Sequence, residues 1–243
     1  LIGVSMTGVG SAAVLQLDMK EAASIVKAEN RRVAKIIGIN QAARTTCVKP
    51  AGTTSLVLGT SSGIHAWHNK YYIRRMRVGK NEPIYSYLSK NHPELIQDEY
   101  FRPHDTAVIE IPQAAPKGSI VRTESAFDLL ERVKRVATDW VATGHKTGSN
   151  THNVSATISL KEKDWEPAGE WMWKNRNTYN GLSVLPYDGG TYTQAPFEDI
   201  TKAKYDEMTK TLQEIDLTKV VEDTDNTDLS GELACAGGSC EIT

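Results

Sequence analysis

Two of the chain's three cysteines lie close together near the end of the sequence, in ELACAGGSCEIT. Cys235 and Cys240 are separated by four residues that include Gly237 and Gly238, and glycines allow the chain to fold back into a small disulfide ring. A zinc site would need two further thiolates or histidines, which this segment lacks. The spacing predicts a dithiol that exchanges with another disulfide by direct sulfur contact, and the alternative is a chance pair.

The segment KPAGTTS at residues 49–55 could bind an anion. A β-prone run ends at Pro50, and the small residues that follow allow the backbone to approach a ligand closely. Thr53, Thr54 and Ser55 then lead into an apolar run that can open a helix, whose first N–H groups would face a phosphate. The Gly-x4-Gly-Lys spacing of a Walker motif is absent. A tight strand-to-helix turn with a threonine cap is the alternative interpretation.

Histidines and arginines are concentrated in GIHAWHNKYYIRRMRV at residues 63–78. The spacing of His65 and His68 suits a metal, but no third ligand lies nearby in the sequence, which favours histidines that pack in a wall or core. Arg74, Arg75 and Arg77 alternate sides of a predicted strand, and they face either phosphates or acidic neighbours.

The overall composition excludes several classes of protein. The 243 residues are 40% hydrophobic and 24% charged with a formal net charge of -2, so the basic excess of a nucleic-acid or membrane-surface binder is absent. No run approaches the roughly 18 apolar residues of a membrane span, and no signal peptide is visible. Three cysteines suit a reducing cytosol, so we expect a cytoplasmic protein.

Hydrophobic periodicity places these candidate sites among alternating strands and helices. The predicted helices are 18–37, 82–95, 125–144 and 165–176, and the predicted strands are 45–50, 71–78, 107–112, 153–160 and 181–187. Asp18 is the expected N-cap of the first helix. Ser125 and Asp128 form a capping-box-like start for the clearest helix, which we expect to end at Gly144.

The segment NVSATISL at 153–160 alternates strictly. The apolar face has Val154, Ala156, Ile158 and Leu160, and the polar face has Ser155, Thr157 and Ser159. A Trp-rich helix and a second strand, GLSVLPY, follow at the spacing of a βαβ unit, which predicts an α/β fold with parallel strands. From Glu222 onward the sequence is acidic, small and polar, which predicts a disordered tail at 222–243 after a domain at 1–221.

With KPAGTTS, NVSATISL, LPYDGGTYTQAPFEDIT and the tail cysteines in place, the whole chain resembles the C-terminal part of class II, adenosylcobalamin-dependent ribonucleotide reductases. The likeness is greatest to the monomeric ribonucleoside-triphosphate reductases. It implies an α/β fold that is the second half of the family's ten-stranded α/β barrel, with a flexible C-terminal tail. The sequence also opens on LIGVSMTGVGSAAV without an initiator Met, as expected of a piece of a larger fold.

The same resemblance assigns roles to residues. It implies that Cys235 and Cys240 re-reduce the active-site disulfide and are themselves reduced by thioredoxin. It implies a ribonucleoside triphosphate substrate, converted to a 2'-deoxyribonucleotide for DNA synthesis, with adenosylcobalamin as the cofactor. The implied substrate-phosphate loop consists of Pro50, Ala51, Gly52, Thr53, Thr54 and Ser55.

The resemblance also implies what this segment lacks. The family's radical-bearing cysteine and the cysteines that the substrate oxidises would lie upstream, and we interpret Cys47, on a strand before the phosphate turn, as buried packing. We therefore expect activity only with an N-terminal reductase chain or segment, either in a split enzyme or in one longer chain. The alternative function is a stand-alone thiol redox or nucleotide-binding module. Co-purification with a larger chain would distinguish the two.

Overall fold

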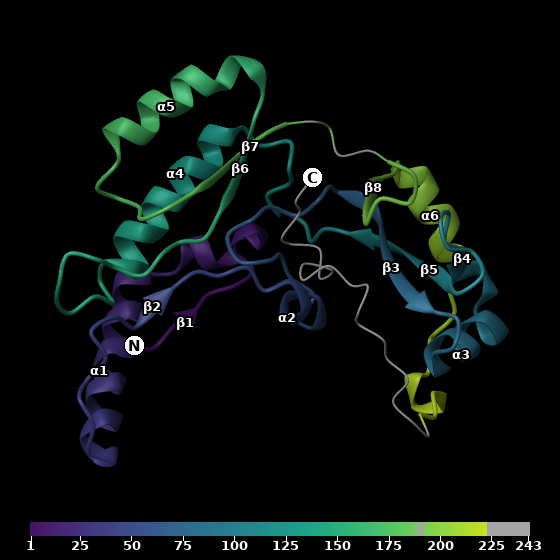
Figure 1. Cartoon of the computed structure of the whole chain (residues 1–243), viewed down its shortest axis with the longest axis horizontal. Helices are drawn as coiled ribbons and strands as arrows, with labels where there is room; N and C mark the ends of the chain where they lie inside the picture. The colour runs from purple at the N-terminus through teal and green to yellow at the C-terminus, as the bar shows by residue number, and fades with distance from the viewer. Residues whose placement is uncertain (188, 190–191, 223–243) are drawn as a thin grey trace. The chain divides into compact units, whose positions relative to one another are not determined.

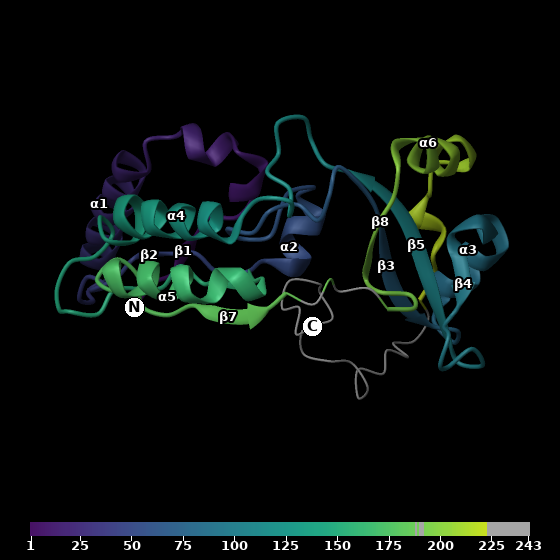
Figure 2. The ribbon, with the colours of Figure 1, turned by 90° about the horizontal axis from the view of Figure 1, so that it is seen from above.

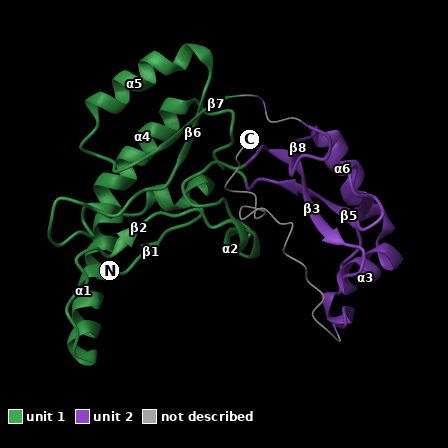
Figure 3. Ribbon diagram, in the orientation of Figure 1, with its two compact units in different colours: residues 1–67, 117–188, 239–242 green, residues 68–116, 189–238, 243 purple. Residues whose placement is uncertain are grey.

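The computed structural model describes residues 1–187, 189 and 192–222. These residues form two compact units, which are coloured separately in Figure 3. Unit 1 consists of residues 1–67 and 117–187, and unit 2 consists of residues 68–116, 189 and 192–222. Cys235 and Cys240, like the rest of the predicted tail from residue 223 on, lie outside the described residues.

Unit 1 contains two parallel two-stranded sheets, β1-β2 and β6-β7 (labelled in Figure 1), and a single isolated bridge links them in the order β1-β2-β6-β7. Ladders join β1 to β2 and β6 to β7, and a bridge between Val48 and Val154 joins the two pairs. The strands are β1 Val4–Ser5, β2 Thr46–Cys47, β6 Thr157–Leu160 and β7 Ser183–Pro186. The helices are α1 Met19–Ile37, α2 Gly52–Val57, α4 Ala126–Val136 and α5 Trp165–Lys174, with a π-helical turn Ala137–Val141 after α4 and 3-10 turns at Val9–Ser11, Ala13–Gln16 and Glu162–Asp164. The predicted parallel βαβ unit, β6-α5-β7, is confirmed.

One face of these linked sheets carries the hydrophobic core of unit 1. The predicted apolar face of NVSATISL is at most 5% exposed, and its residues pack in one cluster with α1, α4 and α5. Figures 1 and 2 show α4 and α5 side by side, and the indole Nε1 of Trp171 on α5 donates to Glu131 on α4 over 2.6 Å. Ser155, Thr157 and Ser159 alternate with the buried residues and are half-buried or exposed, so the sheet has one apolar and one polar face.

The helix starts follow the capping rules that predicted them. Asp18 Oδ1 accepts from the backbone N–H groups of Lys20 and Glu21 at 3.0 Å, so it is the N-cap of α1. Ser125 and Asp128 form a reciprocal capping box at the start of α4. Both predicted caps are therefore confirmed.

The buried side of α1 coincides only in part with the apolar residues whose helical spacing predicted it, which are Ala22, Ile25, Val26, Val33, Ile36 and Ile37. Met19, Ala23 and Ala34 are buried, whereas Ile25 and Ile36 are 62% and 67% exposed. Periodicity therefore predicted the helix correctly, but small residues form most of the side that packs against the rest of unit 1.

Unit 2 is an antiparallel sheet in the order β4-β5-β3-β8. Its strands are β3 Tyr71–Gly79, β4 Ile96–Asp98, β5 Thr106–Ala114 and β8 Phe197–Asp199. Its helices are α3 Pro83–Asn91 and α6 Lys202–Thr211, with 3-10 turns at Pro93–Leu95 and Leu217–Lys219. The strands predicted at 71–78 and 107–112 are confirmed. The helix predicted at 82–95 is present but ends at Asn91, and the 3-10 turn at Pro93–Leu95 follows it.

The observed class is α/β, as predicted. The described residues contain eight strands, four parallel ones in unit 1 and four antiparallel ones in unit 2, and these strands do not show the ten-stranded barrel that the resemblance implied. Within the described ranges, no helix combines the length and the apolar character that crossing a membrane requires.

Candidate functional site

Helix α2 begins at Gly52, two residues after the Pro50 that ends the β-prone run. Its N-cap is Ala51, and no capping side chain accepts from the first helical N–H groups, so the threonine cap of the alternative interpretation is wrong, although the strand-to-helix turn itself is present. Ser55 is buried, and its hydroxyl donates to Gly52 O over 3.2 Å. Thr53 and Thr54 are exposed, and their hydroxyls have no partner among the described residues.

Three backbone N–H groups are open at this helix end. The N–H of Ala51 donates to Ser62 Oγ over 2.9 Å, and the first helical hydrogen bond runs from Ser55 N to Ala51 O over 2.8 Å. Within the described part of the chain, no acceptor meets the N–H groups of Gly52, Thr53 and Thr54. Free N–H groups at the positive end of a helix dipole suit an oxyanion. The helix start thus offers three N–H donors to an anion without the spacing of a Walker motif.

A loop near the start of the chain braces the segment that follows α2. Thr7 Oγ1 donates to Ser61 O over 3.1 Å and accepts from Gly63 N over 2.9 Å. A Cβ on Gly10 would lie 2.3 Å from His65 O, so only glycine permits the two segments to approach this closely. The loop fixes the segment that supplies Ser62 to the turn.

Strand β2, which leads into the turn, is held by the π-helical turn that follows α4. Thr46 Oγ1 donates to Trp140 O over 2.7 Å, and Trp140 Nε1 donates to Cys47 O over 2.9 Å. A Cβ on Gly144 would lie 1.9 Å from Thr46 Oγ1. Gly144, expected only to end the helix, therefore also allows β2 to pack here.

A buried ion pair holds the far side of the same segment. The Arg132 guanidinium donates to both carboxylate oxygens of Glu124 over 2.7 and 2.6 Å, and its Nε donates to Ile64 O over 3.2 Å. The side chains of Arg132 and Glu124 are 6% and 13% exposed, so a broken pair would leave Glu124 with a charge largely removed from water. This pair gives the turn a rigid support.

His65 joins the segment to strand β6. Its Nε2 accepts from Thr157 N over 3.1 Å, so the proton of the neutral ring lies on Nδ1. Burial, reinforced by the charge of Arg122 and more weakly by that of Arg132, lowers the pKa of His65 to about 4. His65 is therefore neutral at pH 7 and acts as a packed wall residue, in agreement with the favoured interpretation.

Cys47 is buried on β2, as predicted, and its thiol is not in a disulfide. Burial raises the pKa of this thiol, although a hydrogen bond with Ser5 and the charge of Lys49 oppose the rise. Cys47 therefore stays protonated at neutral pH, which suits packing rather than nucleophilic chemistry.

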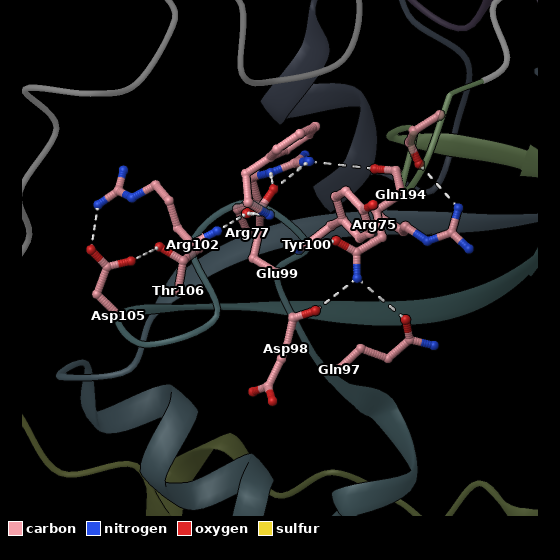
Figure 4. A network of polar contacts seen from close by, with 12 residues as sticks. Arg75, Arg77, Gln97, Asp98, Glu99, Tyr100, Arg102, Asp105, Thr106 and Gln194 are labelled. Atoms are coloured by element: carbon pink, nitrogen blue, oxygen red, sulfur yellow. Dashed lines mark hydrogen bonds and ion pairs between the residues drawn. The ribbon is translucent and has the colours of Figure 1, made fainter.

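Two arginines of β3 pair with acidic neighbours within unit 2, and Figure 4 shows Arg77 beside Glu99. Arg75 pairs with Glu110 and Glu198, and Arg77 pairs with Glu99 at 3.2 Å, so the acidic-neighbour interpretation is correct for both. Burial alone would raise the pKa of Glu99, but the backbone N–H groups that follow it and the Arg77 guanidinium together hold it below its ordinary value.

The remaining basic residues singled out in the sequence also have protein partners. Arg74 lies over the ring of Phe197, 4.9 Å from its centroid, and His68 Nε2 lies 3.1 Å from Asp199. Across the described ranges, no group of three or more His, Cys, Asp or Glu side chains is placed to hold a metal ion.

Sequence reasoning missed the residues that support the turn. Only folding brings Thr7, Gly10 and Ser62 to their supporting positions around the turn. The Gly-x-Gly spacing in TGVGS was the one sequence signal, and it marks the loop of Thr7 and Gly10. Arg132 and Glu124 carry no such signal, because isolated charges occur throughout the chain.

Comparison with solved structures finds a protein of similar fold. A crystal structure of B12-dependent (class II) ribonucleotide reductase matches with a TM-score of 0.68 and 21% identity over 86% of this chain and 33% of that one. This likeness shows that the two share a fold. No family model matches the sequence.

The relatives by sequence are named adenosylcobalamin-dependent ribonucleoside-triphosphate reductases. The protein of Lactobacillus acidophilus is 29% identical over 210 residues, which is 85% of this chain and 27% of the relative. That of Euglena gracilis is 28% identical over 229 residues, 88% of this chain and 29% of the relative. The chain is thus similar to these reductases along most of its length, as the sequence indicated, and it spans less than a third of theirs.

Proposed function

We propose that this chain is the part of a class II ribonucleotide reductase that binds the substrate's phosphates and carries a reducing dithiol. The observation that carries the proposal is the open start of α2, with three free N–H groups and the hydroxyls of Thr53 and Thr54. This helix follows the carboxyl end of parallel strand β2, and α/β sheets bind ligands at such ends. The names of the relatives, which specify ribonucleoside triphosphates, support it.

The turn has a binding and orienting role. The N–H groups of Gly52, Thr53 and Thr54 donate to phosphate oxygens, and the two threonine hydroxyls add further donors. Pro50 and Ala51 contribute a backbone that is already fixed, because Ser62 holds Ala51. Anchoring the triphosphate in this way orients the ribose for chemistry supplied elsewhere in the enzyme.

The parallel sheet of unit 1 needs a partner under this proposal. Within the described residues, β1 and β7 are paired on one side only. Leu1, Ile2 and Val4 at the β1 edge are 79%, 44% and 39% exposed, which is an association surface rather than a stable solvent face. We assign this edge and the polar face of β6 to a barrel that an N-terminal reductase chain or segment completes.

The dithiol proposal rests on the sequence, because Cys235 and Cys240 lie outside the described residues. One tail thiolate attacks one sulfur of the active-site disulfide, forms a mixed disulfide with it and releases the other active-site sulfur as a thiolate. The second tail thiolate then attacks the first tail sulfur and releases the remaining active-site sulfur. The products are a Cys235–Cys240 disulfide and two active-site thiols, so two electrons move to the active site. Thioredoxin then reduces the tail disulfide.

The relatives depend on adenosylcobalamin, and we propose that the complete enzyme uses the same cofactor. We assign none of the cofactor's contacts to this chain and make no step depend on it.

A complementation experiment tests the proposal. The chain is mixed with a reductase fragment that carries the radical cysteine, adenosylcobalamin, a ribonucleoside triphosphate and a reductant, and deoxyribonucleotide is measured. We expect product only when both parts are present. If the mixture forms no product and the chain sediments as a monomer that does not bind the fragment, the stand-alone redox or nucleotide-binding module would be favoured instead.

A further inference from the structure

Unit 1 has an open surface hollow at the opposite end of β2 from the phosphate turn. Its volume is about 540 Å³. The lining comes from the second half of α1, from the loop between α1 and β2, and from Lys146. The loop precedes β2, whereas the phosphate turn follows it, so the two features are separate.

Three cations line this hollow without acidic neighbours. Arg31, Lys35 and Lys146 are all exposed, and the wall carries no Asp or Glu. Within the described part of the chain, none of the three takes part in an ion pair. Asn40 and Gln41 add amide groups that can donate hydrogen bonds. The chain has a net charge of -2, so this gathering of cations is local rather than a general basic excess.

Two of these cations, Arg31 and Lys35, also lie at a spacing that destabilises α1. Lys27, Arg31 and Lys35 follow one another at intervals of four, and like charges at this spacing destabilise a helix. Lys35 lies in the last turn, where it complements the helix dipole, but Arg31 lies a turn earlier and Lys146 lies on another segment. Complementing the helix end therefore explains one cation of the three.

The walls of the hollow are fixed to one another. Gly38 ends α1 in a left-handed conformation with a φ of 72°, which turns the chain back along the helix. Asn30 Oδ1 accepts from Ala42 N over 3.0 Å, and Lys27 Nζ donates to His145 O over 3.1 Å. The hollow is therefore held by contacts that do not use its lining cations.

We propose that this hollow binds an oligophosphate anion, either free or as the phosphate chain of a nucleotide, at Arg31, Lys35 and Lys146. Several cations around one concavity match a ligand with several negative charges, and guanidinium and ammonium groups both donate to phosphate oxygens. The site is additional to the proposed phosphate turn and does not depend on it.

The test uses the full chain with inorganic tripolyphosphate and with ATP in low salt, by calorimetry and thermal unfolding. Arg31→Gln combined with Lys35→Gln removes two cations from α1, and Lys146→Gln removes one from a different segment. Arg32→Gln is the matched control, because Arg32 lies on the same helix but pairs with Glu29 and does not line the hollow. Circular dichroism verifies the fold of each variant.

We expect the α1 double variant to weaken tripolyphosphate binding about tenfold or more, since charge-assisted hydrogen bonds are lost. Lys146→Gln weakens it in the same direction, and Arg32→Gln leaves it unchanged. Without ligand, the thermal-unfolding midpoint of the double variant stays equal to that of the wild type or rises, because repulsion between like charges along α1 is relieved. Equal affinity for the two probes identifies the phosphate chain as the ligand, and tighter ATP binding identifies a nucleotide; both uphold the site.

Two results would overturn the proposal. One is tripolyphosphate affinity that is unchanged in both pocket variants or lost equally in Arg32→Gln. The other is a double variant that unfolds at a lower temperature without ligand and still binds tripolyphosphate as tightly as the wild type. That result would mean that the cations serve only the stability of the helix.

Discussion

Acidification should destabilise unit 1 through His65. The folded ring has a pKa of about 4, whereas an unfolded histidine titrates near 6.5. Between these values the unfolded chain binds a proton that the folded chain excludes, so stability falls as pH falls. The full contribution is present above pH 6.5 and is lost toward pH 4. Linkage gives a decrease of about 2 to 3 kcal/mol in the free energy of unfolding by pH 4.5.

The assay compares urea unfolding at pH 7.5 and 4.5 for the wild type and for His65→Gln. All five tryptophans lie in unit 1, so their fluorescence reports this unit. The glutamine can still accept from Thr157 N but does not titrate, so the variant should lose most of that pH dependence. His104→Gln, at a histidine whose side chain is 78% exposed, is the matched control and should behave as the wild type. Equal pH dependence in wild type and His65→Gln would refute the reasoning.

Three further predictions concern the support, the tail and assembly. Arg132→Met should lower the free energy of unfolding of unit 1 by about 3 to 5 kcal/mol in urea unfolding, because Glu124 keeps a buried charge. Adding Glu124→Gln should restore much of the lost stability, and a double variant no more stable than Arg132→Met would contradict the ion-pair account. Changing Cys235 and Cys240 to Ser should spare a single turnover and abolish thioredoxin-driven turnover, while a small diffusible dithiol restores much of it; undiminished thioredoxin-driven product formation would disprove the shuttle. The isolated chain should self-associate in sedimentation and form a defined complex with the N-terminal reductase part, and a monodisperse monomer indifferent to that part would argue against the assembly.

Local structure was largely predictable from the sequence, because its causes are local. The strict alternation of NVSATISL fixed which side of β6 is buried, and the side chains of Asp18 and Ser125 marked two helix starts. The open start of α2 was also accessible, since small residues and threonines follow Pro50.

Long-range organisation was not predictable in the same way. Strand periodicity does not specify a partner or its direction, so the antiparallel sheet of unit 2 was not separated from the parallel sheet of unit 1. The braces from Thr7 and Arg132 join segments more than fifty residues apart. Their geometry depends on the folded chain, so no local pattern encodes it.

The most direct test of the central claim is the affinity of the assembled enzyme for a ribonucleoside triphosphate in equilibrium dialysis. Thr53→Val combined with Thr54→Val removes two hydroxyl donors from the exposed turn without touching its buried supports. Each charge-assisted hydrogen bond contributes about 1.5 to 3 kcal/mol, so the account predicts at least tenfold weaker binding with nearly unchanged folding. Thr138→Val, at an exposed threonine after α4, is the matched control and should bind normally. Undiminished affinity in the double variant would contradict the claim that this turn holds the substrate's phosphates.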